Sequence, residues 1–160
     1  MEKCTNEQKY LNYKEQMGRL NRAINNEFYL EAIFIEGAII EDRVESFLRT
    51  SGGLNLEKQR TLDRKLSRLC ELQRNKKSEI RKYLSDELLE SVYQWKSKRN
   101  PLVHALLKRE IATEELISVV NEGYAIVKKL NNGSTSYRRK MTKNNQADDV
   151  QLSTCKGEED

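Results

Sequence analysis

Residues 27–50, EFYLEAIFIEGAIIEDRVESFLRT, are the most continuously apolar segment of this 160-residue chain. Apolar side chains fall on nearly every side of a helix drawn through the segment, so such a helix must be covered by neighbours on most sides. Ser51-Gly52-Gly53 follows, which is typical of a helix end and a turn. We therefore place this helix at the centre of an all-α bundle and regard it as a candidate dimer interface.

Glu36 interrupts the main apolar stripe of this helix. The stripe is formed by Tyr29, Ile33, Ile40, Val44 and Phe47. A carboxylate among apolar side chains needs a cationic partner, and we predict that this partner is Arg99. The pair would either orient Arg99 for a substrate or form a purely structural ion pair, and both interpretations stay open. Gly37 is expected to let another helix approach closely.

Apolar residues at helical spacing predict the rest of the scaffold. We expect helices over residues 5–24, 55–74, 80–84, 86–99 and 113–130. The central helix and these helices, apart from the short one at 80–84, would form an antiparallel bundle of about five helices over residues 1–132. Tyr10 and Tyr13 are expected in its core, although aromatic side chains also stack on bases.

Asn131-Asn132-Gly133-Ser134 is expected to end the bundle, because the apolar periodicity stops there. A basic cluster and then an acidic end follow. This composition predicts a disordered charged tail over residues 133–160.

Composition narrows the class of protein. Charged residues make up 34% of the chain, which has one Pro and seven Gly, and this favours long solvated helices over sheets. No apolar run is long enough for a membrane span, and the N-terminus lacks a signal pattern. Cys4, Cys70 and Cys155 are too scattered for a disulfide framework or a zinc site. We expect a cytoplasmic protein with no membrane partner.

Positive charge is concentrated in one segment. Residues 57–82 contain ten Lys or Arg and four Asp or Glu, a local charge of +6. A basic helix is a suitable contact for a phosphate backbone, although it can equally be a solvated helix face. The candidate RNA-binding residues are Arg64, Lys65 and Arg68 in this segment and Lys98 and Lys108 beyond it.

Residues 99–104, Arg-Asn-Pro-Leu-Val-His, hold the only His and the only Pro. Arg99 continues the apolar series Leu88, Val92 and Trp95, so it is expected to face inward, where a guanidinium needs an anion. Asn100 suits an N-cap and Pro101 the first position of a new helix. His104 would then lie near the positive end of a helix dipole, as a proton acceptor. A fixed cation beside a titratable ring is a plausible site for phosphoryl chemistry.

Several catalytic motifs are absent from the sequence, namely a Gly-rich phosphate loop, His-Glu-x-x-His, Cys-x-x-Cys and Gly-x-Ser-x-Gly. No cofactor and no metal are expected, although a site built from carboxylates alone stays open.

Arg-Asn-x-x-x-His inside an all-helical domain of this size resembles the Arg-x4-6-His signature of the HEPN superfamily. The resemblance implies a helical bundle that forms a homodimer, with the two motifs facing each other, and in many members a metal-independent endoribonuclease of toxin–antitoxin or phage-defence systems. Arg99 and His104 take the catalytic positions, with Asn100 and Glu36 in support. Leu106 stands where some such toxins carry a Tyr that their antitoxin modifies, so regulation of that kind is not expected.

Cleavage of single-stranded RNA is therefore the predicted function, with RNA, a second copy and a cognate antitoxin or defence-system protein as partners. The alternatives are a non-catalytic helical module that binds RNA or protein, and a purely structural helical protein.

Overall fold

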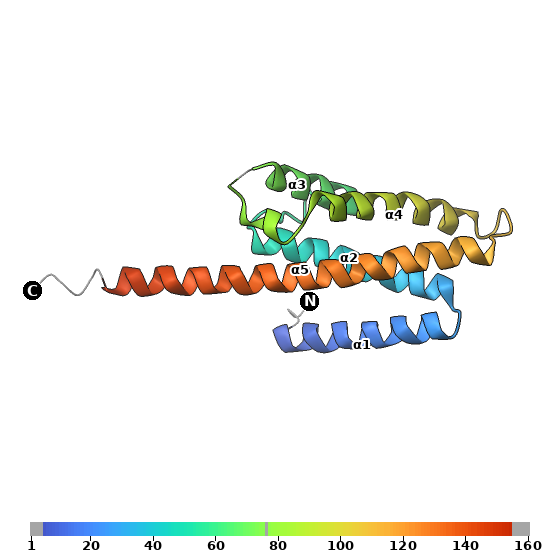
Figure 1. Ribbon diagram of the computed structural model, residues 1–160, viewed down its shortest axis with the longest axis horizontal. Helices are drawn as coiled ribbons and strands as arrows, with labels where there is room; N and C mark the ends of the chain where they lie inside the picture. Colours follow the sequence, from blue (N-terminus) through green and yellow to red (C-terminus); the bar gives the residue numbers. More distant parts are fainter. Residues whose placement is uncertain (1–4, 76, 155–160) are drawn as a thin grey trace, which may run out of the picture. The chain divides into compact units, whose positions relative to one another are not determined.

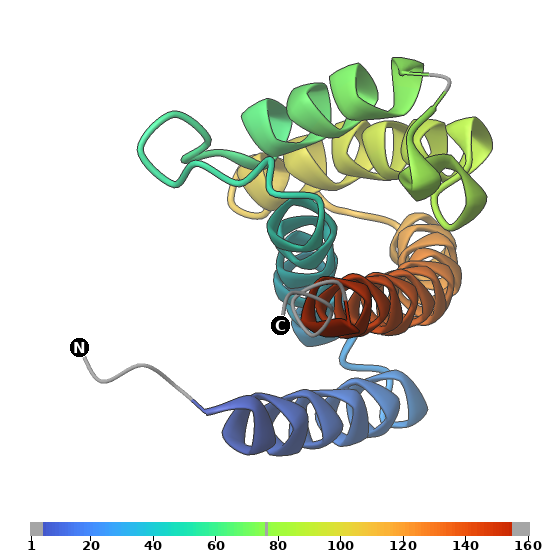
Figure 2. The ribbon, with the colours of Figure 1, turned by 90° about the vertical axis from the view of Figure 1, so that its left-hand side faces the viewer.

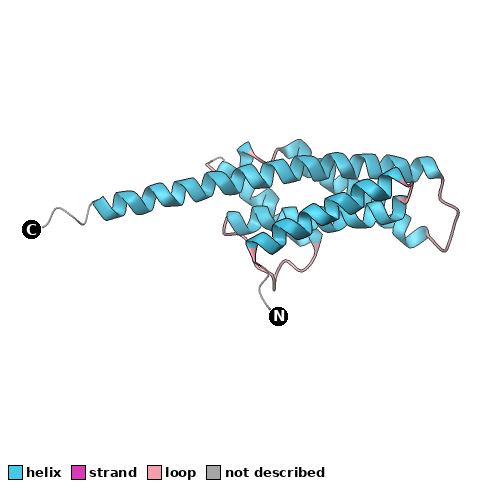
Figure 3. Ribbon diagram, turned by 90° about the horizontal axis from the view of Figure 1, so that it is seen from below, coloured by secondary structure: helices cyan, strands magenta, loops and turns pink. Residues whose placement is uncertain are grey.

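The computed structural model describes residues 5–75 and 77–154, and within these ranges every regular element is helical (Figure 3). The elements are α1 (Asn6–Asn25), α2 (Tyr29–Thr50), α3 (Leu62–Arg74), the short 3-10 helix η1 (Glu79–Lys82), α4 (Asp86–Ala105) and α5 (Thr113–Thr154) (Figure 1). The all-α prediction is confirmed.

Local sequence explains where the helices begin. Thr5 caps α1 by accepting a hydrogen bond from the Gln8 N–H at 3.1 Å, and Thr61 caps α3 by accepting one from the Arg64 N–H at 3.4 Å. The expected helix over 55–74 starts later, because the Asn55 side chain accepts from the backbone N–H groups of Glu57 and Lys58, both at 3.1 Å. These bonds close a turn in place of the first helical residues.

The chain divides into two compact units. Unit 1 is Met1–Arg43 with Asp86–Leu130, and unit 2 is Val44–Ser85 with Asn131–Asp160. Helices α2 and α5 each contribute one part to both units.

Unit 1 contains four helical segments in which α2 and α5 lie between α1 and α4 (Figures 1 and 2). Successive segments run antiparallel (Figure 1). Trp95, 1% exposed, donates from Nε1 to the Val119 carbonyl at 2.9 Å and so ties α4 to α5. The Arg43 guanidinium of α2 lies 4.9 Å from the centre of the Tyr13 ring of α1. The Tyr10 prediction is wrong, because α1 projects this ring outward and leaves it 64% exposed.

Unit 2 is built around aromatic rings. The Tyr137 ring of α5 lies 6.0 Å from that of Phe47 and 5.6 Å from that of Tyr83, measured between ring centres. Lys65 of α3 reaches Glu45 of α2 at 2.6 Å and is buried. Gln73, also buried, donates to the Leu84 carbonyl at 2.6 Å.

The predicted break at Asn100-Pro101 is wrong, since α4 continues through Pro101 to Ala105. A proline inside a helix removes one backbone hydrogen bond, whereas the residues after it keep theirs. Leu102, 1% exposed, gains its burial when the helix continues. The Asn100 side chain does not cap a helix and instead accepts a hydrogen bond from Arg99 Nη1 at 3.3 Å.

The predicted disordered tail is also wrong over residues 133–154, which belong to α5. Gly133 is required for close packing, because an added Cβ would collide with the Tyr83 carbonyl oxygen and lie 3.1 Å from the Phe47 ring. Ser134 and Tyr137 are buried one turn further on. These contacts within unit 2 stabilise a segment whose composition is otherwise typical of a tail. Residues 155–160 lie outside the described part of the chain.

Candidate functional site

Arg99 lies on α4 against Gly37 of α2. An added Cβ at Gly37 would be 3.7 Å from Arg99 Nη2 and 3.7 Å from the Trp95 ring, which are ordinary contact distances. Another helix does lie against Gly37, but the prediction that glycine permits an especially close approach is wrong, because an alanine would also fit. Arg99 is half-buried, and its Nε atom is buried without a hydrogen-bond partner. Such a donor is costly unless a ligand satisfies it.

Glu36 is completely buried, as the sequence indicated, but it does not pair with Arg99. Neither carboxylate oxygen has a hydrogen-bond partner. The carboxyl group occupies space left by Gly123 of α5, where an added Cβ would collide with Oε2 of Glu36 and lie 2.6 Å from Trp95 Nε1. Burial raises the pKa of Glu36 to about 9. The ion-pair prediction is therefore wrong, because among the described residues neither oxygen of Glu36 contacts the Arg99 guanidinium.

His104 lies in the last turn of α4 and is exposed. Contrary to the prediction, His104 does not lie at the positive end of a helix dipole, because α4 does not restart at Pro101. Each helical residue turns the chain by about 100°, so Arg99 and His104, five residues apart, point in directions about 140° apart. Within the described residues no hydrogen bond joins the two side chains, and one protomer does not bring them together.

The candidate RNA-binding residues fall into both units. Lys65 is excluded as an RNA contact, because its side chain is 5% exposed and paired with Glu45. In unit 2, Arg64 is exposed, and Arg68 is 42% exposed and paired with Glu71. In unit 1, exposed Lys98 binds Glu122 of α5 at 2.7 Å. Lys108, in the turns after α4, is exposed.

Five large apolar side chains of α2, of the last turn of α4 and of the turn after it are exposed, and the sequence indicated only some of them. They are Leu30, Phe34, Val103, Leu106 and Leu107, which we call together the apolar surface. Phe34 is 71% exposed and Leu107 fully exposed. For Leu30 and Phe34, the indication in the sequence was that α2 is apolar on nearly every side.

Comparisons with models of protein families, with curated proteins and with solved structures find no match to this chain. Among the described residues, no three His, Cys, Asp or Glu side chains gather as metal ligands. None of the helices in residues 5–75 and 77–154 combines the length and apolar composition needed to span a bilayer.

Proposed function

We propose that this protein is a metal-independent endoribonuclease whose site is completed by a second copy of the chain. The observation that carries the proposal is that the C-terminal end of α4 holds both a half-buried Arg99, whose Nε lacks a partner, and an exposed His104. A guanidinium with unused donors is suited to a phosphate, and an imidazole is suited to proton transfer near neutral pH.

The apolar surface supports a homodimer. Leu102 and Ile33 are both buried, and α2 and α4 run antiparallel (Figure 1), so Val103 and Phe34 project to the same side of the helix pair. A contiguous exposed apolar patch is typical of a protein interface. A two-fold axis through it would join identical surfaces and bring two copies of α4 together.

Two protomers would supply the groups that one lacks. Cleavage of RNA by its own 2′-OH needs a base for that proton, an acid for the 5′-oxygen and positive charge on the pentavalent phosphorane. One His104 would act as the base, the second His104 or water as the acid, and the Arg99 pair would stabilise the phosphorane. Asn100 would hold Arg99 through its hydrogen bond. Products would be a 2′,3′-cyclic phosphate and a 5′-hydroxyl.

The buried Glu36 supports this assignment by its charge state. Because burial raises its pKa to about 9, Glu36 is uncharged near neutral pH. It therefore leaves the positive charge of Arg99 unneutralised and available to a substrate phosphate. The resemblance to the HEPN superfamily adds the proposed setting, a toxin–antitoxin or phage-defence system with a cognate antitoxin or defence-system protein as partner.

The test is incubation of the purified protein with single-stranded RNA in excess EDTA. We expect cleavage that His104→Ala and Arg99→Ala each reduce by at least about 100-fold. Phe34→Glu should reduce both cleavage and the dimer mass measured by light scattering. Tyr10→Glu, at an exposed ring outside the apolar surface, is the matched control. Equal cleavage by the parent and His104→Ala, or a strictly monomeric active protein, would overturn the proposal.

A second candidate is a non-catalytic RNA-binding module. It is favoured by the roughly 140° between the directions of Arg99 and His104 and by the exposed Arg64 and the partly exposed Arg68 on α3. This candidate predicts salt-sensitive RNA binding that survives His104→Ala, with no product.

A further inference from the structure

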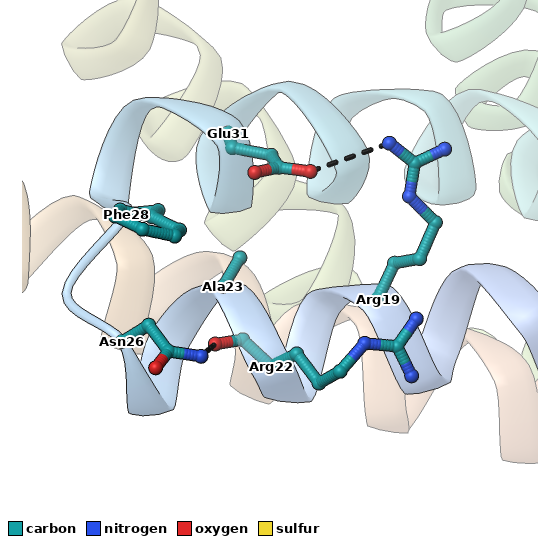
Figure 4. Close-up of a pocket in the computed structure, with 6 residues that line it drawn as sticks. All are labelled: Arg19, Arg22, Ala23, Asn26, Phe28 and Glu31. Carbon is teal, nitrogen blue, oxygen red and sulfur yellow. Dashed lines mark hydrogen bonds and ion pairs between the residues drawn. The ribbon is translucent and has the colours of Figure 1, made fainter.

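The junction of α1 and α2 contains a cavity of about 250 Å³ in unit 1 (Figure 4). It is lined by Arg19, Arg22, Ala23, Asn26, Phe28 and Glu31. Figure 4 shows the Phe28 ring at one end of the cavity and the two guanidinium groups toward the other, with Ala23 between them. The cavity therefore has an aromatic end and a cationic end.

The cationic end has unused hydrogen-bond donors. Among the described residues, the Arg22 guanidinium has no hydrogen-bond acceptor and no carboxylate partner, and it lies beside Gly18, where an added Cβ would be 3.4 Å from Nη1. Arg19 makes one contact, from Nη2 to Glu31 Oε1 at 3.3 Å, and a guanidinium has five donors. Two guanidiniums and one carboxylate leave a net charge of +1, which matches one phosphodiester.

The aromatic end is held by a hydrogen-bonded turn. The Phe28 N–H donates to the Ala23 carbonyl at 2.8 Å, and Asn26 Nδ2 donates to the Arg22 carbonyl at 2.7 Å. Glu27 adopts a left-handed backbone, with φ of 61°, to complete the turn. This turn leaves the Phe28 ring 60% exposed, so the core does not account for it.

We propose that this cavity binds one unpaired nucleotide of an RNA strand, with its phosphate on Arg22 and Arg19 and its base stacked on Phe28. A ring face and a guanidinium are the two contacts by which proteins hold single-stranded nucleic acid without reading sequence. Oε2 of Glu31 and Oδ1 of Asn26 have no partner among the described residues and can accept hydrogen bonds from base N–H groups.

The cavity would extend the proposed cleavage site, and the inference rests on RNA being its substrate. The α1–α2 junction and the C-terminal end of α4, which carries His104, lie at the same end of unit 1 (Figure 1). Because α2 lies between α1 and α4 (Figures 1 and 2), a strand cleaved at Arg99 and His104 would reach the cavity only through several further nucleotides.

The test is binding of a labelled single-stranded RNA, measured by fluorescence anisotropy in the full-length His104→Ala protein. Phe28→Leu, which keeps an apolar side chain but removes the ring, should weaken binding about tenfold, and Phe28→Trp should restore it. Arg22→Ala should weaken binding about fivefold and reduce the slope of log affinity against log salt by about 0.7.

Control variants distinguish RNA binding at the cavity from the proposed RNA cleavage. Tyr10→Leu and Lys14→Ala change an exposed ring and an exposed cation on α1 outside the cavity, and each should alter affinity less than twofold. If Phe28→Leu and Arg22→Ala bind RNA as the controls do, or if no variant binds RNA, the cavity proposal is overturned. Loss of binding by these variants while the His104-containing parent releases no product would support the cavity and overturn the nuclease.

Discussion

Two buried charged side chains, Lys65 of unit 2 and Glu36 of unit 1, differ in whether the fold gives them a partner. In unit 2, Lys65 is 4% exposed and forms an ion pair with Glu45 at 2.6 Å. In unit 1, Glu36 is 0% exposed and neither carboxylate oxygen has a hydrogen-bond partner, while the Nε of Arg99 is buried and equally unpaired. Both glutamates are on α2.

Lys65 and Glu36 are therefore buried for different reasons. The Lys65–Glu45 pair is satisfied by the folded chain itself, so packing accounts for it. Glu36 and Arg99 cost stability that no contact in the described residues offsets. Perturbed, unsatisfied groups of this kind concentrate at functional sites, which directs attention to unit 1.

The largest expected effect is the pH dependence of stability that the unpaired carboxyl group of Glu36 produces. Because the pKa of Glu36 is raised to about 9 in the folded protein, the unfolded chain releases this proton above about pH 4.5 and the folded chain keeps it. The Glu36 contribution to stability therefore falls as pH rises from about 4.5 to about 9, by roughly 3 kcal/mol between pH 4.5 and pH 7. Glu36→Gln should remove this slope and be more stable at pH 7 by a similar amount, measured by urea unfolding. Parallel stability curves for the two proteins would show that Glu36 is ionised and paired.

Two glycines of unit 1, Gly123 and Gly37, should respond differently to an added methyl group. Gly123→Ala places a Cβ against Glu36 and Trp95, both buried, and should lower the free energy of unfolding by about 2–3 kcal/mol. Gly37→Ala meets Arg99 and Trp95 only at 3.7 Å and should raise it by about 0.5–1 kcal/mol. Thermal unfolding of both variants measures the difference, and equal destabilisation would contradict this geometry.

In unit 2 the paired lysine should be needed for stability. Lys65→Met leaves Glu45 without its shorter ion pair and should cost about 2 kcal/mol, less than a fully buried pair because the Glu45 side chain is 23% exposed. Adding Glu45→Gln should recover most of this loss. If a double-mutant cycle gave no coupling energy between Lys65 and Glu45, Lys65 would contribute no more to stability than an ordinary surface lysine.

The smallest effect is expected at Arg99. Since its buried Nε has no partner to lose, Arg99→Met should not lower the free energy of unfolding, and removal of the unsatisfied donor should raise it by up to about 0.5 kcal/mol. The same substitution type at Lys65 is the matched control. A loss at Arg99 as large as that at Lys65 would remove the contrast between the two units.

Local sequence was enough to predict the first two helices and the burial of Glu36. The limits of α1 and α2 differ by one or two residues from the expected 5–24 and 27–50, because apolar spacing and a Thr cap act within a few residues.

Only tertiary contacts decided the rest. Pro101 and Gly133 are local signals for a helix end, yet burial of Leu102 and the contact of Gly133 with Tyr83 keep α4 and α5 helical there. Lys65 is one of several similar basic residues in α3 until its partner on α2 is known. The cavity at Phe28 and the separation of Glu36 from Arg99 depend on how distant segments pack, and no periodicity along the chain encodes such distances.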